Sequence, residues 1–177
     1  YTITVKDKVV SHWKLDEDVI PTTFVDSYGN NDGSSSAGIY PTPTMGRVNG
    51  AMSFDGGDEI SIPSSTDFDL SNNESLSLEL WIKTTQSETT NKVFVGRYNS
   101  SETDTWWIGM NNGNPKLYLR DSDENSQVLT GSSVINDGNW HHIVGLYDHN
   151  NNYMKIFVDG SIDDSISTSF TGNFSGN

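Results

Sequence analysis

The nine residues from position 75 to position 83, Ser-Leu-Ser-Leu-Glu-Leu-Trp-Ile-Lys, decide the fold class. Successive side chains of an extended strand point to opposite faces, so alternate residues share a face. One face of this segment is wholly apolar and consists of Leu76, Leu78, Leu80 and Ile82. The other face consists of Ser75, Ser77, Glu79, Trp81 and Lys83. This pattern predicts a half-buried strand of a two-layer protein.

Other segments of the chain show related patterns. Residues 140–148, WHHIVGLYD, alternate, and residues 153–158, YMKIFV, follow a polar tetrapeptide that is typical of a hairpin turn. Further short strands are expected at Lys92–Tyr98, Trp106–Met110 and Lys116–Arg120. No segment keeps a helical apolar period for three turns. The sequence therefore predicts an all-β fold, namely a two-sheet antiparallel sandwich or jelly roll.

The beginning and the end of the chain have weaker strand signals. Residues 16–45 are rich in loop-forming residues, and loops of that length are usually functional, metal-bound or disordered. The last stretch, Ser161–Asn177, is mostly polar. We expect one weak strand there, running into a frayed end.

Composition excludes several classes of protein. A length of 177 residues suits one domain, and the absence of Cys excludes disulfides and thiolate catalysis. The net charge is −14, from 10 basic and 24 acidic residues. Such a charge repels phosphate backbones, so no nucleic-acid partner is expected. No apolar run approaches the roughly 20 residues of a membrane helix, so no membrane insertion is expected either.

Four segments carry a family resemblance. The first is residues 12–17, HWKLDE, followed by residues 26–33, DSYGNNDG. The second is residues 46–60, GRVNGAMSFDGGDEI, and the third is the strand at residues 75–83. The fourth joins residues 137–142, DGNWHH, with Tyr147-Asp148 and residues 156–160, IFVDG. In this order and spacing they resemble the laminin-G-like, concanavalin A-like jelly-roll domains, from about Ser11 to Gly160.

The resemblance implies two antiparallel sheets packed face to face, with loops at the rims. It implies that residues 1–177 are a single domain. Members of the family usually continue for several strands past the Val-Asp-Gly turn, so the final C-terminal strands are expected to be missing here. The exposed sheet edge would then be covered by a longer parent chain or by a strand lent by a neighbouring subunit. Tyr1–Val5, which alternates, is the candidate for such a donated strand.

A cation site is expected in the acidic loops. Calcium takes six to eight oxygen ligands, and the sharp loop DSYGNNDG can offer several. The candidate ligands are Asp26, Asn30, Asp32 and Asp58. The resemblance implies a structural Ca²⁺ between this loop, the Phe-Asp-Gly-Gly-Asp segment and a late acidic residue. The alternative is that Asp26 and Asp32 only make Asx-turns. Residues 121–125, DSDEN, are interpreted as an acidic hairpin tip.

A carbohydrate site is expected on the later strands. Sugars stack on aromatic rings, and their hydroxyls need paired donors and acceptors. The candidates are Arg97, Trp106, Tyr118 and Arg120. Trp106 and Trp107 must point to opposite faces of one strand, so one of them belongs to the core. The resemblance makes Trp13, Trp81 and Trp140 framework aromatics.

The sequence has few signs of catalysis. Adjacent strand residues His141 and His142 cannot both bind one ion, and we interpret them as structural. Jelly-roll glycanases place two acids together on one strand, whereas Glu79 stands alone here. The leading hypothesis is a non-catalytic recognition module that binds glycans or a surface protein within a larger assembly. We expect it to be extracellular, on a cell surface or on a virion. The alternatives are a self-associating coat, decoration or filament subunit, and a glycan hydrolase or lyase on the same fold.

Overall fold

The computed structural model describes residues 9–19, 23–98 and 104–175. The chain divides into two compact units, residues 1–67 and residues 68–177. The interpretation of the chain as a single domain stays a prediction. The candidate donated strand, Tyr1–Val5, lies outside the described residues.

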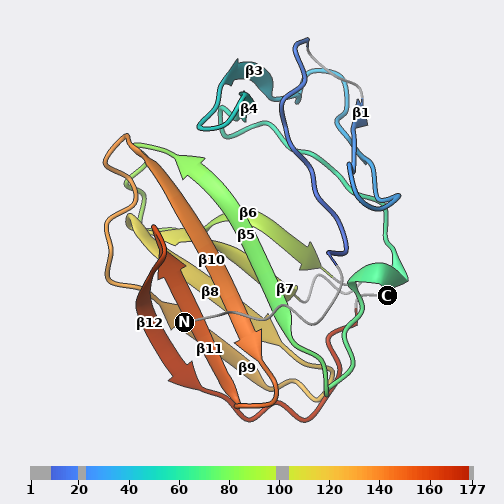
Figure 1. The fold of residues 1–177 in the computed structure, drawn as a ribbon, viewed down its shortest axis with the longest axis vertical. Coiled ribbons are helices and arrows are strands. Elements are labelled where there is room, and N and C mark those ends of the chain that lie inside the picture. Colours follow the sequence, from blue (N-terminus) through green and yellow to red (C-terminus); the bar gives the residue numbers. More distant parts are fainter. Residues whose placement is uncertain (1–8, 20–22, 99–103, 176–177) are drawn as a thin grey trace. The chain divides into compact units, whose positions relative to one another are not determined.

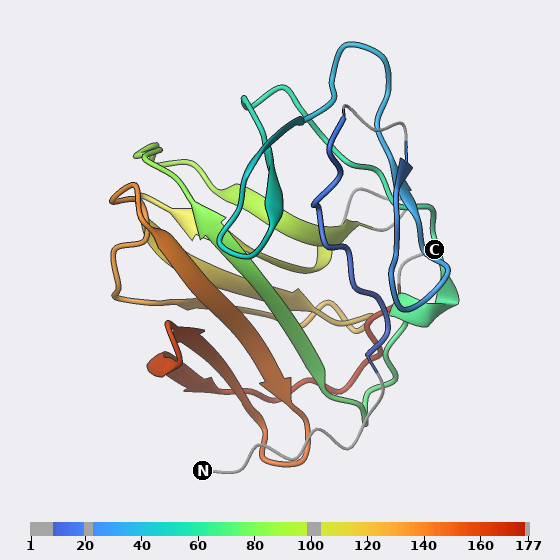
Figure 2. The ribbon, with the colours of Figure 1, turned by 45° about the horizontal axis from the view of Figure 1, so that its top comes forward.

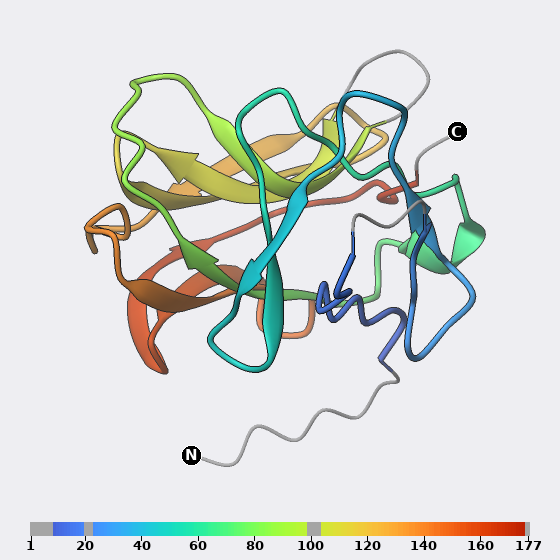
Figure 3. The same cartoon turned by 90° about the horizontal axis from the view of Figure 1, so that it is seen from above.

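The second unit is built from two four-stranded antiparallel sheets (Figure 1). The strands of the first sheet, in spatial order, are β12 (Ser161–Ser167), β11 (Tyr153–Val158), β10 (Trp140–Asp148) and β5 (Leu76–Lys83). Those of the second sheet are β6 (Lys92–Tyr98), β7 (Asp104–Asn111), β8 (Asn114–Arg120) and β9 (Ser126–Thr130). Seen along its edge in Figure 3, this unit has two layers. The predicted antiparallel sandwich is therefore confirmed.

The core of this unit lies between the two sheets. Its fully buried side chains come from both layers: Ile108, Leu117 and Leu119 from one, and Ile143, Tyr147, Met154 and Ile156 from the other. The four alternate apolar residues of β5 pack against this cluster, as their alternation predicts. At Gly145 of β10, a Cβ atom would lie only 2.9 Å from Leu117 Cδ1, which shows how closely the sheets approach.

In each sheet, one pair of neighbouring strands is joined by a tight two-residue turn. Between β7 and β8, Asn112 and Gly113 have φ angles of 49° and 83°. Between β11 and β12, Asp159 and Gly160 have φ angles of 51° and 81°. Two successive positive φ angles define a type I′ turn, whose twist matches that of the flanking strands. In Figure 2 the resulting meander of β10, β11 and β12 runs from orange to red.

The first unit is mostly loop, as expected for this part of the sequence. It contains two short hairpin pairs: β1 (Thr23–Phe24) with β2 (Gly33–Ser34), and β3 (Thr42–Met45) with β4 (Gly50–Ser53). Among the described residues one 3₁₀ turn, η1, spans Thr66–Phe68, where the first unit ends in the sequence and the second begins. No helix among the described residues is long and apolar enough to cross a membrane.

The end of the chain corrects one expectation. From β12 to Ser175, the last described residue, the chain does not fray, because Phe170 and Phe174 are buried and their ring centroids lie 5.0 Å apart, edge to face. Both rings also contact Tyr147 of β10, each at 5.5 Å. The backbone N–H groups of Leu70 and Phe174 each donate to the other's carbonyl. This polar stretch is therefore ordered by two aromatic anchors.

Candidate functional site

The most promising binding surface is the outer side of the second sheet. Strand β8 alternates between half-buried and buried residues, so its core-facing leucines leave every second side chain on the outer side. We call this surface the Tyr118 face and define it by Trp107 of β7, Lys116, Tyr118 and Arg120 of β8, and Val128 of β9. It combines aromatic rings with two cations.

The rings of the Tyr118 face are arranged by strand register. Trp107, Tyr118 and Val128 are direct cross-strand neighbours in one row. The Trp107 and Tyr118 rings are stacked, with centroids 5.6 Å apart and planes 17° from parallel. Gly96 is the neighbour of Trp107 in this row on β6, where a Cβ atom would lie 2.7 Å from the Trp107 Cβ atom. The glycine therefore leaves room for the indole.

The two cations lie on either side of Tyr118 along the strand. Lys116 Nζ donates to Asn91 Oδ1 at 3.0 Å and lies 5.9 Å from the centroid of the Trp107 ring. The guanidinium of Arg120 lies 3.8 Å from a carboxylate oxygen of Glu124, whose side chain is 83% exposed. An ion pair so exposed to solvent is weak, so the guanidinium of Arg120 can still bind another partner.

The four predicted sugar contacts do not share one face. Tyr118 and Arg120 lie on the outer side, whereas Trp106 belongs to the hydrophobic core and is 7% exposed. Arg97 is paired with Trp106 in the register and is 9% exposed, with its Nη2 atom 2.7 Å from Asp69 Oδ1. Arg97 and Trp106 therefore do not lie on the face that holds Tyr118 and Arg120, and sugar binding by these four residues stays a prediction.

Trp107 is the residue that the sequence left undecided. It lies outside the core cluster, on the opposite side of β7 from Trp106, but is itself only 4% exposed. On the Tyr118 face it is a buried ring that stacks with the ring of Tyr118. The half-buried Tyr118 and the exposed Val128 present the accessible apolar area.

In the first unit, the carboxylate of Asp26 organises the predicted cation loop. Its Oδ1 atom accepts hydrogen bonds from the backbone N–H groups of His12, Tyr28 and Gly29, at 2.8–3.1 Å. Its Oδ2 atom accepts the N–H of Asn31 at 3.1 Å. Burial acts to raise the pKa of Asp26, but these hydrogen bonds outweigh it and hold the pKa well below its usual value. The charge of Asp26 therefore already has structural partners.

The other predicted calcium ligands serve local contacts. Asp32 Oδ1 accepts the backbone N–H of Asp26 at 2.8 Å, so the structure brings these two residues together. Asp58 Oδ2 accepts the backbone N–H of Asp55, within its own turn, and Asn30 is exposed. Within the described ranges, no group of three or more His, Asp or Glu side chains is arranged to hold a metal. Calcium binding stays a prediction.

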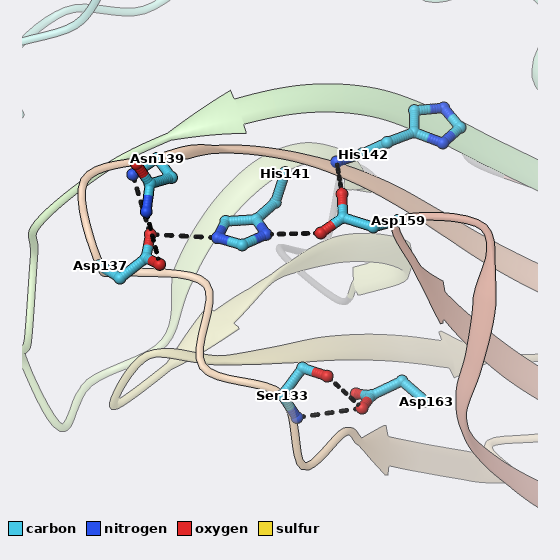
Figure 4. A network of polar contacts seen from close by, with 7 residues as sticks. All are labelled: Ser133, Asp137, Asn139, His141, His142, Asp159 and Asp163. Atoms are coloured by element: carbon cyan, nitrogen blue, oxygen red, sulfur yellow. Dashed lines mark hydrogen bonds and ion pairs between the residues drawn. The ribbon is translucent and has the colours of Figure 1, made fainter.

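The two adjacent histidines lie on opposite sides of β10, as predicted (Figure 4). The ring of His141 lies between two carboxylates, with Nδ1 2.8 Å from Asp159 Oδ2 and Nε2 3.1 Å from Asp137 Oδ1. Burial acts to lower the pKa of His141, but the two carboxylates outweigh it and raise the pKa. Both contacts are structural, because they tie turns to the start of β10.

On the outer side of the first sheet, the position of Trp81 differs from the one that its interpretation as a framework residue implies. His142 Nε2 lies 2.9 Å from Glu79 Oε1, and the ring of His142 lies 5.0 Å from that of Trp81. Trp81 is 43% exposed, because it alternates with the leucines that face the core. The interpretation of Trp81 as a packed framework residue is therefore wrong. The alternation that predicts β5 places Trp81 on the face opposite the leucines, so the sequence itself indicated this outer position.

Comparison with known proteins supports this fold. Residues 54–177 match the family model Laminin_G_3, described as the concanavalin A-like lectin/glucanases superfamily. Neurexin 1 of Drosophila melanogaster is 28% identical over 129 residues, which are 71% of this chain and 7% of that protein. The chain thus spans a small part of this relative.

Two solved structures are similar over most of the chain. The binding domain of Paraclostridial Mosquitocidal Protein 1 has a TM-score of 0.70 and 14% identity, covering 91% of this chain and 43% of that one. Domain 4 of AbnA, a GH43 extracellular arabinanase from Geobacillus stearothermophilus in complex with arabinotriose, has a TM-score of 0.66 and 23% identity. It covers 96% of this chain and 79% of that one. At these identities the likeness is one of fold.

Proposed function

We propose a function for this chain, which belongs to the concanavalin A-like lectin/glucanases superfamily. It is a non-catalytic recognition module that binds glycans through the Tyr118 face. The observation behind this proposal is the stacked Trp107–Tyr118 pair with a cation on each side of Tyr118 along the strand. An aromatic ring offers a sugar an apolar face, and neighbouring polar groups fix the orientation of its hydroxyls.

A binding role fits this surface better than hydrolysis does. Glycoside hydrolysis commonly needs a pair of carboxyl groups on either side of the scissile bond. The Tyr118 face, as defined by its five residues, offers cations and rings but no carboxylate. On the other sheet, Glu79 is paired with His142 rather than with a second acid.

The names of the similar proteins point the same way. Two of them are the binding domain of a mosquitocidal protein and a domain of an extracellular arabinanase in complex with arabinotriose. We propose by analogy that this chain also works outside the cell, as part of a larger assembly. A surface protein as partner and a self-associating coat subunit remain the competing interpretations, and the experiment below separates them from glycan binding.

A glycan array with the wild-type chain and two variants tests the proposal. Tyr118→Ala removes the ring at the centre of the face and should abolish binding. Tyr153→Ala is the matched control, because Tyr153 is a half-buried tyrosine on the outer side of the other sheet, with Lys155 Nζ 4.1 Å from its ring centroid. It should leave binding unchanged.

Running the array with and without EDTA tests calcium at the same time. Loss of binding in EDTA would support the predicted Ca²⁺ site. A wild-type chain that binds no glycan on the array, while folded, would contradict the proposal and leave the protein-partner and coat interpretations. Binding that is lost equally in both tyrosine variants would contradict the assignment to the Tyr118 face.

A further inference from the structure

We propose that the glycan bound by the Tyr118 face is anionic and carries carboxylate groups, as a chain of uronic acids does. This inference rests on the proposed function and names the class of ligand for the same face. It follows from the charges of the second sheet, from the position of its cations and from the hydrogen-bonding capacity of the groups that the face exposes.

The charge of the second sheet is opposite to that of the chain. The chain has a net charge of −14, with 24 acidic and 10 basic residues. Strands β6 to β9 hold four of the ten basic residues but only one of the acidic ones, Asp104 at the start of β7. Fixed cations gathered on one sheet of an acidic protein attract anions locally, while the rest of the surface repels them.

Two of these four cations are on the outer side. Lys116 and Arg120 are each two residues from Tyr118 on β8, so each lies about 6.6 Å along the strand from it. Of the outer two, Arg120 has only the exposed 3.8 Å pair with Glu124. The other two have closer partners: Arg97 pairs with Asp69 on the inner side, and Lys92 pairs with Glu88 at 2.5 Å. A glycan stacked over Tyr118 would therefore meet a cation in both directions along β8.

The hydrogen-bonding groups of the face favour a ligand that accepts hydrogen bonds. A neutral sugar presents hydroxyls that both donate and accept, so its site needs acceptors as well as donors. Lys116 and Arg120 only donate, and the remaining members of the face, Trp107 and Val128 beside Tyr118, supply no charged acceptor. A carboxylate only accepts, and guanidinium groups bind carboxylates in a bidentate geometry. The face therefore matches a carboxylate better than a neutral diol.

The experiment compares two ligands that differ only in charge. An oligogalacturonate and its carboxyl-reduced counterpart of the same length are titrated calorimetrically into the wild-type chain. The acidic oligosaccharide should bind about tenfold more tightly at low ionic strength, and this preference should shrink at about 0.15 M salt, where exposed charges are screened.

Variants then test whether Lys116 and Arg120 cause the preference for the acidic oligosaccharide. Lys116→Gln and Arg120→Gln should each weaken binding of the oligogalacturonate roughly fivefold, the size expected for an exposed charge pair, and should leave the carboxyl-reduced ligand nearly unaffected. Lys155→Gln is the matched control, since Lys155 lies over the ring of Tyr153 on the other sheet, as Lys116 lies over the ring of Trp107. It should change neither affinity. Unchanged thermal melts show that the variants are folded.

Three outcomes would overturn the inference. The first is equal or tighter binding of the carboxyl-reduced ligand. The second is binding of a heparin-derived oligosaccharide without any binding of the oligogalacturonate, which would assign the face to sulfate. The third is an equal loss of affinity in Lys155→Gln. In the first two cases the chain still binds glycans, so the proposed function survives, whereas an array without any bound glycan contradicts that function itself.

Discussion

The Nδ1 atom of His141 lies 2.8 Å from the Oδ2 atom of Asp159, at the turn that joins β11 to β12. The other oxygen of Asp159 accepts the backbone N–H of His142, and the second ring nitrogen of His141 faces Asp137 (Figure 4). A neutral imidazole has one N–H, so donating to both carboxylates requires the charged form. The protonated ring therefore links the turn before β10 to the turn after β11.

This link predicts a pH-dependent stability. The pKa of His141 is raised above its usual value of 6.5, so its contribution is fully present below about pH 6.5 and is lost as the pH rises through the folded-state pKa. The Asp137 pKa, lowered to about 2 by the backbone and side chain of Asn139 and then by His141, keeps that carboxylate charged throughout. We expect the melting temperature to fall by roughly 2–4 °C between about pH 6 and pH 9 from this residue.

Thermal melts across this range check the pH prediction. His141→Gln should remove most of this fall, whereas His12→Gln, which changes an exposed histidine of the first unit, should keep it. A wild-type melting temperature that rises steadily over the same range, with no difference in His141→Gln, would show that the link does not contribute.

Asp26→Ala should destabilise the protein with or without metal. Removing the carboxylate leaves the N–H groups of His12, Tyr28, Gly29 and Asn31 without their acceptor. Of these donors the N–H of Asn31 is buried, and a buried donor left unsatisfied costs about 1–3 kcal/mol, so the free energy of unfolding should fall by roughly that amount. Urea denaturation in EDTA measures it. Asp58→Ala is the control, because Asp58 holds only its own turn. A loss below about half a kcal/mol for Asp26→Ala would contradict the structural role.

The same samples test the calcium prediction. If Ca²⁺ binds the loop at residues 26–33, it stabilises the folded state by mass action, and EDTA should lower the melting temperature of the wild-type chain. Added Ca²⁺ should restore it, and Asp26→Ala should lose this response. A wild-type sample known to hold calcium whose melting temperature is unchanged by EDTA would leave the loop with its Asx-type hydrogen bonds alone.

Truncating a core leucine to alanine should lower the free energy of unfolding by an amount that depends on how deeply that leucine is buried. Leu117 is 1% exposed between the sheets, whereas Leu78 of β5 is half-buried against the same cluster. Leu117→Ala should cost about 2–5 kcal/mol of unfolding free energy, and Leu78→Ala less, because fewer contacts are lost and the site can relax toward solvent. Equilibrium unfolding in urea compares the two. A loss below about half a kcal/mol for Leu78→Ala would mean that the face of β5 is assigned wrongly.

The alternation of side chains predicted more of the fold than of the site. Strands β5, β10 and β11 keep an uninterrupted period of two, and their bounds could be predicted to within a residue. Strand β6 has register shifts between Val93 and Val95 and again between Arg97 and Tyr98. Each bulge exchanges the two faces for the residues beyond it, so the inner position of Arg97 could not be inferred from its spacing.

Other parts of the structure depend on contacts that are distant in sequence. Nothing local distinguishes Trp106 from Trp107, and the choice between them is made by the packing of Trp106 into the core cluster. Phe170 and Phe174 lie among polar residues and are buried only because Tyr147 provides a surface for them. The scarcity of acids in the second sheet was visible in the sequence, but its meaning required knowing which strands share a sheet.

Glu124→Gln should strengthen the binding of an acidic ligand at the Tyr118 face. Glu124 is the only carboxylate found beside Arg120 among the described side chains, at 3.8 Å, and it competes with a ligand for the guanidinium. Because the pair is exposed, its removal should raise the affinity for the oligogalacturonate about two- to fivefold at low salt, and less at about 0.15 M. Glu88→Gln is the matched control, since Glu88 pairs with Lys92 outside the face. Titration of both variants decides the matter: an affinity that is unchanged in Glu124→Gln, or raised equally in Glu88→Gln, would show that Arg120 does not contact the anion.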